Sequence, residues 1–109
     1  MPRYLISFDE HAMDHIPDED LTAVADAAHA VVKEAQDAGV WVFGGGLYGD
    51  PIMVAGDGTV SGGTHPLGGL SIVDVPSRDA ALEWAAKIAT ACRCAQAVNE
   101  FMPDPAVGN

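Results

Sequence analysis

Histidine is the side chain best suited to proton transfer near neutral pH, and the four histidines of this chain fall in three separate segments. His29 lies in a stretch with helical periodicity. At 100° per residue it falls at the edge of the apolar stripe, with Asp26 and Lys33 further round on the polar side. Its imidazole could therefore act as a general acid or base beside a pocket. It could equally be a boundary histidine that bonds to a loop or faces solvent.

His65 belongs to the stretch GDGTVSGGTHPLGG, residues 56–69. It follows two glycines and a threonine and precedes Pro66, so its backbone is expected to be extended and its ring could enter a cleft between sheet and loop. It could also be an ordinary loop histidine. Tyr48 and Trp41 could line the same cleft, although aromatic residues here are more often core or dimer interface. With Asp57 they form our ligand-binding prediction.

The same glycine-rich stretch does not read as a phosphate-binding loop. Gly56, Gly58 and Gly62 have the spacing G-x-G-x-x-x-G, one residue longer than the dinucleotide fingerprint. The segment that follows them predicts a strand, where a phosphate site needs a helix N-terminus. No lysine occurs between Lys33 and Lys87. We therefore predict no nucleotide and no other cofactor.

His11 and His15 stand four residues apart among acids and raise the question of a metal site. Both would face one side only if the segment were helical, and it shows no apolar face. We predict a solvated acidic loop and no metal. Cys92 and Cys94 form a lone C-x-C without further ligands, which predicts two reduced thiols at a helix end.

Two helices are predicted to position these residues. From residue 21 apolar side chains recur with helical spacing. The carboxylates of Asp18, Glu19 and Asp20 precede this stretch and could cap the helix. Gly39 follows it and is expected to end the helix. The members of this stripe are Leu21, Val24, Ala25, Ala28, Val32 and Ala35. A second stripe lies within residues 78–92, with Ser77 as its N-cap.

Short β-branched and aromatic runs predict the strands, at residues 4–8, 40–43 and 70–75, with a short strand or hairpin after residue 50 and a last strand within 95–102. Two helices interspersed in a mostly antiparallel sheet predict an α+β, ferredoxin-like split β-α-β fold. At 109 residues the chain forms one domain, residues 1–102, followed by a loose tail at 103–109.

The strands are apolar on both faces. In the second strand, Val40 and Val42 lie on one face and Trp41 and Phe43 on the other. In the first strand, Tyr4, Ile6 and Phe8 lie on one face and Leu5 on the other. Two helices can cover only one face of such a sheet. The chain has no residues left for the other, so we predict a homodimer whose two sheets face each other.

Charge and composition limit the partners. Sixteen acids against five scattered bases give a net charge of −11, which disfavours nucleic acid. No stretch has the ~20 apolar residues that span a bilayer, and the first ten residues lack a basic segment followed by an apolar one. We expect a soluble, cytoplasmic protein with no membrane partner.

The phrases LGGLSIVDVPS and ALEWAAKI resemble the YCII-related family, and especially its DGPF branch. Asp57-Gly58 is followed ten residues after the aspartate by Leu67-Gly68-Gly69, the offset found in that branch. YLISF, QDAG and VWVFGGGL also resemble the family's opening. The chain departs from the branch in reading Thr59-Val60 where Pro-Phe is expected, and no role of the family's residues there carries over.

The resemblance implies a dimeric α/β barrel built from two ferredoxin-like subunits. It also implies a histidine on the first helix paired with an aspartate after the second strand, which would be His29 and Asp50 here. We therefore consider two hypotheses for the function of the protein. One is a cofactor-free enzyme in which His29 or His65 is the acid or base for a cyclic or aromatic compound. The other is a non-catalytic ligand-binding or interaction module associated with a transcriptional regulator.

Overall fold

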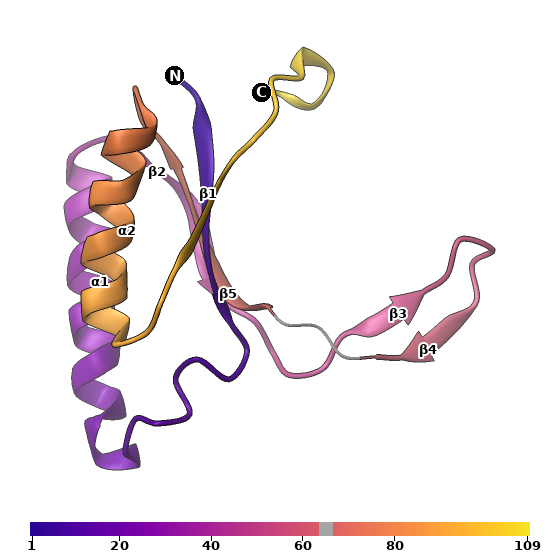
Figure 1. The fold of residues 1–109 in the computed structure, drawn as a ribbon, viewed down its shortest axis with the longest axis horizontal. Helices are drawn as coiled ribbons and strands as arrows, with labels where there is room; N and C mark the ends of the chain where they lie inside the picture. The colour runs from indigo at the N-terminus through magenta and orange to yellow at the C-terminus, as the bar shows by residue number, and fades with distance from the viewer. Residues whose placement is uncertain (64–66) are drawn as a thin grey trace.

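The computed structural model describes residues 1–63 and 67–109. The chain begins with strand β1, continues through a turn and helix α1, and alternates strands with helix α2 before ending in a short 3-10 turn (Figure 1). The elements are β1 Arg3–Asp9, η1 Asp18–Asp20, α1 Leu21–Asp37, β2 Trp41–Gly46, β3 Ile52–Val54, β4 Val60–Gly62, β5 Leu67–Asp74, α2 Arg78–Cys92, β6 Ala97–Glu100 and η2 Pro105–Val107.

The residues at the helix ends explain where the helices begin and end, except at the N-terminus of α1. Gly39 has a φ of +75°, the left-handed conformation that ends a helix, and the Ser77 hydroxyl accepts a 3.2 Å hydrogen bond from the Ala80 amide at the start of α2. The predicted carboxylate cap of α1 is wrong. Asp18–Asp20 form a 3-10 turn without a side-chain cap, and the Asp20 carboxylate instead accepts a 2.8 Å bond from Arg93.

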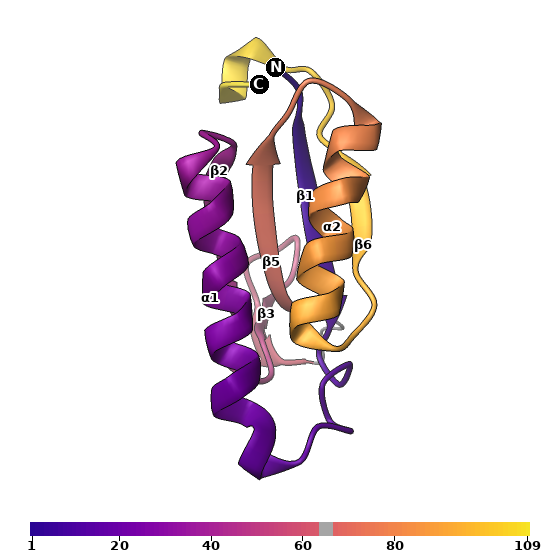
Figure 2. The ribbon, with the colours of Figure 1, turned by 90° about the vertical axis from the view of Figure 1, so that its left-hand side faces the viewer.

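Four strands form an antiparallel sheet in the order β2-β5-β1-β6. Both helices lie side by side on one face of that sheet (Figure 2), and the other face carries no helix (Figure 1). This is the ferredoxin-like α+β arrangement predicted from the sequence. The two central strands of the sheet, β1 and β5, pair along most of their length although they are far apart in sequence.

The helix-side face of the sheet packs tightly. Ile6 and Val73 are almost fully buried and meet Ala81, Ala85 and Ile88 of α2. Alanines at the contact let the helix approach the strands closely, which fills the space between the layers. The apolar stripe predicted for residues 78–92 is confirmed by the burial of Ala81, Ala85, Ile88 and Cys92.

The opposite face, which we call the outer face, is also apolar but open. Its central row consists of Leu5, Ile72 and Phe43, which are register partners across β1, β5 and β2. The sequence pattern placed Trp41 and Phe43 on the same face, and this is wrong. The register shifts between them, so Trp41 packs on the helix-side core while Phe43 is 66% exposed.

Strands β3 and β4 form a hairpin that stands away from the sheet on the side of the outer face (Figure 1). Every residue from 52 to 62 is exposed. The Cα radius of gyration is 15.4 Å, above the ~13 Å of a compact chain of this length, and the molecule measures 43 × 43 × 18 Å. The sheet, the helices and the hairpin therefore form an L rather than a sphere.

The C-terminal residues fold locally. The Asp104 carboxylate accepts a 3.1 Å bond from the Ala106 amide, and backbone bonds join Asp104 to Asn109. Residues 102–109 are exposed and lie on the outer-face side (Figure 1). Neither helix of the described chain is long and apolar enough to cross a bilayer.

Candidate functional site

A cavity of about 610 Å³ lies between α1 and the sheet. Its volume and its mostly apolar walls are those of a small-molecule site. Its apolar lining residues include Phe8, Met13, Leu21, Val24, Val32, Trp41, Ile88 and Cys92, with Ala25, Ala28, Leu70 and the glycines of β2 completing the wall. We call this space the α1 cavity.

The predicted stripe of α1 forms one wall of this cavity. Val24 is buried, whereas Leu21 and Ala25 remain exposed even though they belong to the same stripe. A stripe that packed directly on the sheet would be covered along its whole length. Here the helix stands off the sheet over part of that length, and the apolar side chains face a space instead of a strand.

Glycines of β2 let an aromatic residue form the floor of the α1 cavity. A Cβ added at Gly44 would lie 2.6 Å from the Leu70 carbonyl oxygen and 2.8 Å from the Trp41 indole. The indole therefore occupies the place where a side chain at Gly44 would stand. The sequence predicted that Trp41 lines a cleft between sheet and loop together with Tyr48; the structure places Trp41 in the lining of the α1 cavity and leaves Tyr48 outside that lining.

The Leu-Gly-Gly motif has a related explanation at the other end of the cavity. A Cβ at Gly69 would lie 2.6 Å from Cζ of the Phe8 ring, and one at Gly68 would lie 2.9 Å from the Asp9 carbonyl oxygen. Gly69 is the register partner of Phe8, and the ring lies over the glycine backbone. The two glycines thus hold Phe8 where it lines the α1 cavity.

Among the residues that the structure describes, three with polar side chains line the α1 cavity: His29, Gln36 and Ser71. His29 and Gln36 project from α1 and Ser71 from β5, so they come from opposite walls. No side-chain hydrogen bond or ion pair joins His29 to another described residue. The described part of the cavity lining includes no lysine, arginine, aspartate or glutamate, so these residues can hydrogen-bond a hydroxyl or carbonyl group but offer no counter-charge.

The remaining predicted site residues lie elsewhere. Tyr48 and Asp50 follow β2, both exposed, and neither lines the α1 cavity. The structure brings His29 and Trp41 to one cavity but shows no contact between His29 and Asp50 in the described part of the chain. His65 lies outside the described residues.

Asp57 sits at the turn of the β3–β4 hairpin. Its carboxylate accepts a 2.9 Å hydrogen bond from the Thr59 amide, which is the main reason that the pKa of Asp57 is lowered. Gly58 has a φ of +89° and its amide bonds to the Ala55 carbonyl at 2.8 Å. Asp57-Gly58 therefore builds a tight turn, a signal that the dipeptide itself carries.

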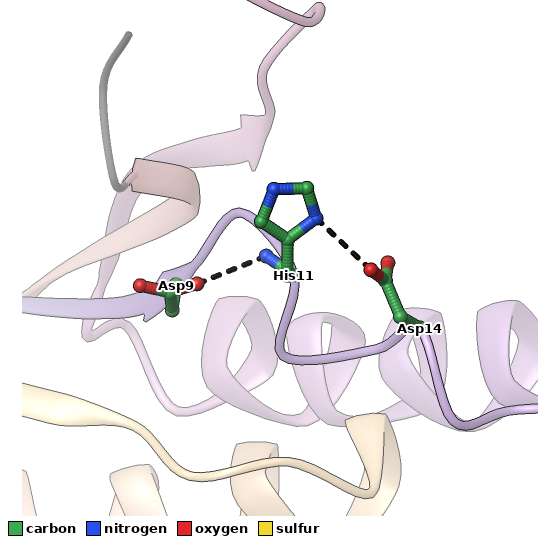
Figure 3. Close-up of polar contacts among 3 residues, drawn as sticks. All are labelled: Asp9, His11 and Asp14. Carbon is green, nitrogen blue, oxygen red and sulfur yellow. Dashed lines mark hydrogen bonds and ion pairs between the residues drawn. The ribbon is translucent and has the colours of Figure 1, made fainter.

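Sequence reasoning missed a histidine–carboxylate pair in the loop after β1. The His11 ring nitrogen Nδ1 lies 2.9 Å from Asp14 Oδ2, and the His11 amide donates to Asp9 Oδ1 at 3.0 Å (Figure 3). The hydrogen bond that the Asp14 carboxylate accepts, followed by the charge of that carboxylate, raises the pKa of His11. The sequence prediction considered His15 as the residue that pairs with His11, because the two are four residues apart. In the structure His11 pairs instead with Asp14, three residues away.

The loop also supplies apolar contacts, contrary to the sequence prediction. Ile16 is buried and Met13 packs against the core while lining the α1 cavity. The described residues hold no cluster of three or more potential metal ligands.

Cys92 and Cys94 are free thiols at the C-terminal end of α2. Cys92 is buried and lines the α1 cavity, and desolvation raises its pKa. A thiol whose pKa is raised by burial is a poor nucleophile. Its contribution to the cavity is therefore apolar surface.

Comparison with known proteins places the chain in a family. Residues 4–100 match the model of the YCII-related domain, and the chain belongs to that family. The prediction from LGGLSIVDVPS and ALEWAAKI is thereby confirmed, while the finer likeness to the DGPF branch continues to rest on the motif spacing. No match was found among curated proteins.

A solved structure with the same fold is that of 5-chloro-2-hydroxyhydroquinone dehydrochlorinase from Burkholderia phenoliruptrix AC1100, in complex with 2,5-dihydroxybenzoquinone. It is 14% identical to this chain, with a TM-score of 0.54, and the match covers 95% of this chain and 97% of the other. At that identity the likeness establishes the shared fold.

Proposed function

We propose that the chain binds a small ring compound in the α1 cavity and that His29 transfers a proton to or from a hydroxyl or carbonyl group of that ring. The observation that carries the proposal is an apolar space of about 610 Å³ whose lining, among the described residues, includes three with polar side chains, one of them a histidine. An aromatic or alicyclic ring can face Trp41 and Phe8 while its oxygen bonds to the polar groups.

The lining also supports a choice of ligand. Because no lysine or arginine lines the cavity in the described part of the chain, a phosphate or carboxylate would lose its hydration without gaining a counter-charge. The enzyme of the same fold acts on a chlorinated hydroxyhydroquinone, by its name, and its structure holds a hydroxylated quinone. That likeness supports a ring that bears oxygen substituents, and the residues here favour an uncharged one.

His29 could supply or accept the proton because it belongs to the cavity lining and is exposed, and no side-chain hydrogen bond or ion pair joins it to another described residue. Gln36 lies two turns further along α1, and Ser71 stands on the opposite wall. These two side chains can hold a ring oxygen in place, which leaves proton transfer to the histidine.

Binding is tested by recording amide NMR shifts while hydroquinone, kept reduced, is added. We expect shifts around His29 and Gly44–Gly46 and none in the β3–β4 hairpin. Phenyl phosphate, which adds charge to a similar ring, is expected to bind at least tenfold more weakly, also at ~0.5 M salt, where long-range repulsion from the net charge of −11 is screened. Equal binding of both compounds, or shifts outside the cavity, would refute the proposed site.

Proton transfer is tested separately with cyclohexanone in D₂O, by following deuterium uptake at the ring by mass spectrometry. We expect the protein to accelerate exchange and His29→Gln to lower the accelerated rate by ~10²-fold or more, as loss of a general acid or base does. Binding of hydroquinone to His29→Gln should stay within about threefold. If the variant binds and exchanges like the parent protein, His29 is not the acid or base, and the chain is a ligand-binding module without this chemistry.

A further inference from the structure

Two ion pairs join the helices, which lie side by side on the sheet (Figure 2). Lys87 of α2 pairs with Glu34 of α1. Arg93, directly after α2, donates a 2.8 Å hydrogen bond to Oδ2 of Asp20, directly before α1. Within the described residues no other side-chain hydrogen bond joins these two parts of the chain. The pairs hold α1 near both of its ends and use two of the five basic residues of the chain.

Other side chains between the helices do little to fix how they meet. A groove of about 700 Å³ lies between them, and Glu34, Lys87 and Arg93 belong to its lining. The rest of the lining is made mostly of small residues, which are Ala23, Ala27, Ala30, Ala86 and Ala91, with Val24, Val31 and Thr90. Alanine side chains are too short to interlock across an open groove. The ion pairs are therefore the contacts that span it.

The backbone at Arg93 supports a role for its side chain. Arg93 ends α2 in the left-handed conformation, with a φ of +56°, where glycine is the usual residue because a Cβ is disfavoured there. The residue after the end of α1, Gly39, has the same conformation without that cost. A glycine at position 93 would relieve the backbone but would leave Asp20 without its partner.

The rotation of α1 about its own axis decides which of its apolar residues meet the core. One row, which we call the core row, consists of Val24, Val31 and Ala35, which lie within ~20° of one another's direction at ~100° per residue. This row is buried or packs against the core. A second row lies ~60–100° further round and lines the α1 cavity; this cavity row consists of Leu21, Ala25 and Val32. Both rows carry similar apolar side chains, so packing alone distinguishes weakly between two rotations of the helix.

The ion pairs favour one of these rotations. Asp20 and Glu34 lie ~40° and ~80° from the direction of Val24, on the side away from the cavity row. If α1 turned to bring the cavity row onto the core, both carboxylates would move away from α2 and both pairs would be lost. Leu21 and Val32 would then fill the space that a ligand needs, and His29 would turn with the helix.

We propose that the ion pairs Glu34–Lys87 and Asp20–Arg93 fix the rotation of α1 and thereby hold the α1 cavity open. The four side chains are positioning residues, since none of them lines that cavity. The proposal deepens the function proposed for the α1 cavity and rests on it where ligand binding is concerned. Exposed ion pairs contribute little to the stability of a fold, but a modest contribution suffices to choose between two rotations of similar packing.

The first measurement is the affinity for hydroquinone, kept reduced, of a variant that neutralises both carboxylates, Asp20→Asn with Glu34→Gln. We expect its dissociation constant to rise about threefold or more, which two exposed ion pairs can produce. The matched control, Asp26→Asn with Asp37→Asn, removes the same charge but breaks only the Lys33–Asp37 pair within α1. It should change the constant by less than ~1.5-fold. If the control weakens binding as much, the effect is one of net charge and the proposal is refuted.

Exchange of the charges across one pair provides a rescue. Glu34→Lys alone places a second cation beside Lys87 and should weaken hydroquinone binding. Adding Lys87→Glu restores the pair in reverse and should return the dissociation constant to within ~1.5-fold of the parent value. Failure of the exchange to restore binding contradicts the proposal. The urea midpoint of every variant should stay within ~0.5 M of that of the parent chain, which separates lost positioning from lost folding.

A second measurement needs no ligand and so separates this inference from the proposed function. A soluble gadolinium chelate broadens the NMR signals of exposed groups. In the parent chain the methyl groups of Val24, 3% exposed, should be protected, and those of Leu21, 43% exposed, should be broadened. In Asp20→Asn with Glu34→Gln this contrast should fall by about half or more as the rotated helix becomes populated.

The two measurements fail in different ways. An unchanged contrast between Val24 and Leu21 overturns the proposal even if binding weakens. A parent chain that does not bind hydroquinone removes the proposed function, whereas the contrast still decides whether the ion pairs fix the rotation of α1.

Discussion

The two faces of the four-stranded sheet carry similar apolar side chains but differ in what covers them. On the helix side Ile6 is 0% and Val73 1% exposed, against two helices supplied by the same chain. On the outer side their immediate neighbours in sequence, Leu5 and Ile72, lie in an open row that ends at the exposed Phe43. Apolar residues in a strand therefore form a buried core only where another layer of the structure covers that face of the sheet.

The comparison also separates two kinds of apolar surface within the helix side itself. The buried core cluster includes Ala81, Ala85 and Ile88 of α2, whereas the space between α1 and the sheet forms most of the α1 cavity. Tight packing serves stability, and the incomplete packing under α1 leaves room for a ligand. The outer face is open on a larger scale, which suits a protein surface rather than a small molecule.

The largest expected difference between the two faces comes from neighbouring residues of β1. Ile6→Ala removes a fully buried side chain and should lower the free energy of unfolding by about 2–5 kcal/mol. Leu5→Ala, one residue away on the outer face, should cost about 1 kcal/mol or less at low protein concentration. Urea denaturation at a fixed, dilute concentration measures both. Equal losses would mean that the outer face is as well packed as the core within a single chain.

A second pair of neighbours compares the faces by adding a methyl group. Gly44→Ala places a Cβ 2.6 Å from the Leu70 carbonyl oxygen and 2.8 Å from the Trp41 indole, so it should cost about 1–3 kcal/mol. Gly45→Ala meets nothing within 4 Å and should change stability by about 0.5 kcal/mol or less. Thermal unfolding measures the difference. A larger loss from Gly45→Ala would show that the outer face near β2 is not open.

The smallest effect is expected in the exposed loop that joins β1 to α1, which belongs to neither face. Because its folded-state pKa is raised by Asp14, His11 contributes stability that is fully present below its unfolded pKa and is lost as pH rises through the folded value. Asp14→Asn should lower the His11 midpoint in an NMR titration. Asp9→Asn should lower it less, since Asp9 contributes least to the shift. The prediction fails if the two substitutions move the midpoint equally.

The predicted site residues that the structure places along one cavity, His29 and Trp41, lie on regular elements. His29 falls at the edge of the apolar stripe of α1, and this position on the helix brings it to the α1 cavity. Asp50 and Tyr48 lie in a connection, where sequence spacing does not determine distance, and they lie outside that cavity. The His11–Asp14 pair was missed because a turn, rather than a helix, brings the two side chains together.

The amino-acid sequence by itself determined the elements, the ferredoxin-like class and the family, because periodicity, helix-ending glycines and the LGG and ALEWAAKI motifs are local. Tertiary structure decided three other features. Strand pairing between β1 and β5 sets Phe8 on Gly69, the register shift in β2 sends Trp41 and Phe43 to opposite faces, and the hairpin turn at Asp57-Gly58 stands clear of the sheet. The first two depend on contacts between strands distant in sequence, whose energies no local pattern contains. The turn of the hairpin is local, but its position away from the sheet is a feature of the tertiary structure.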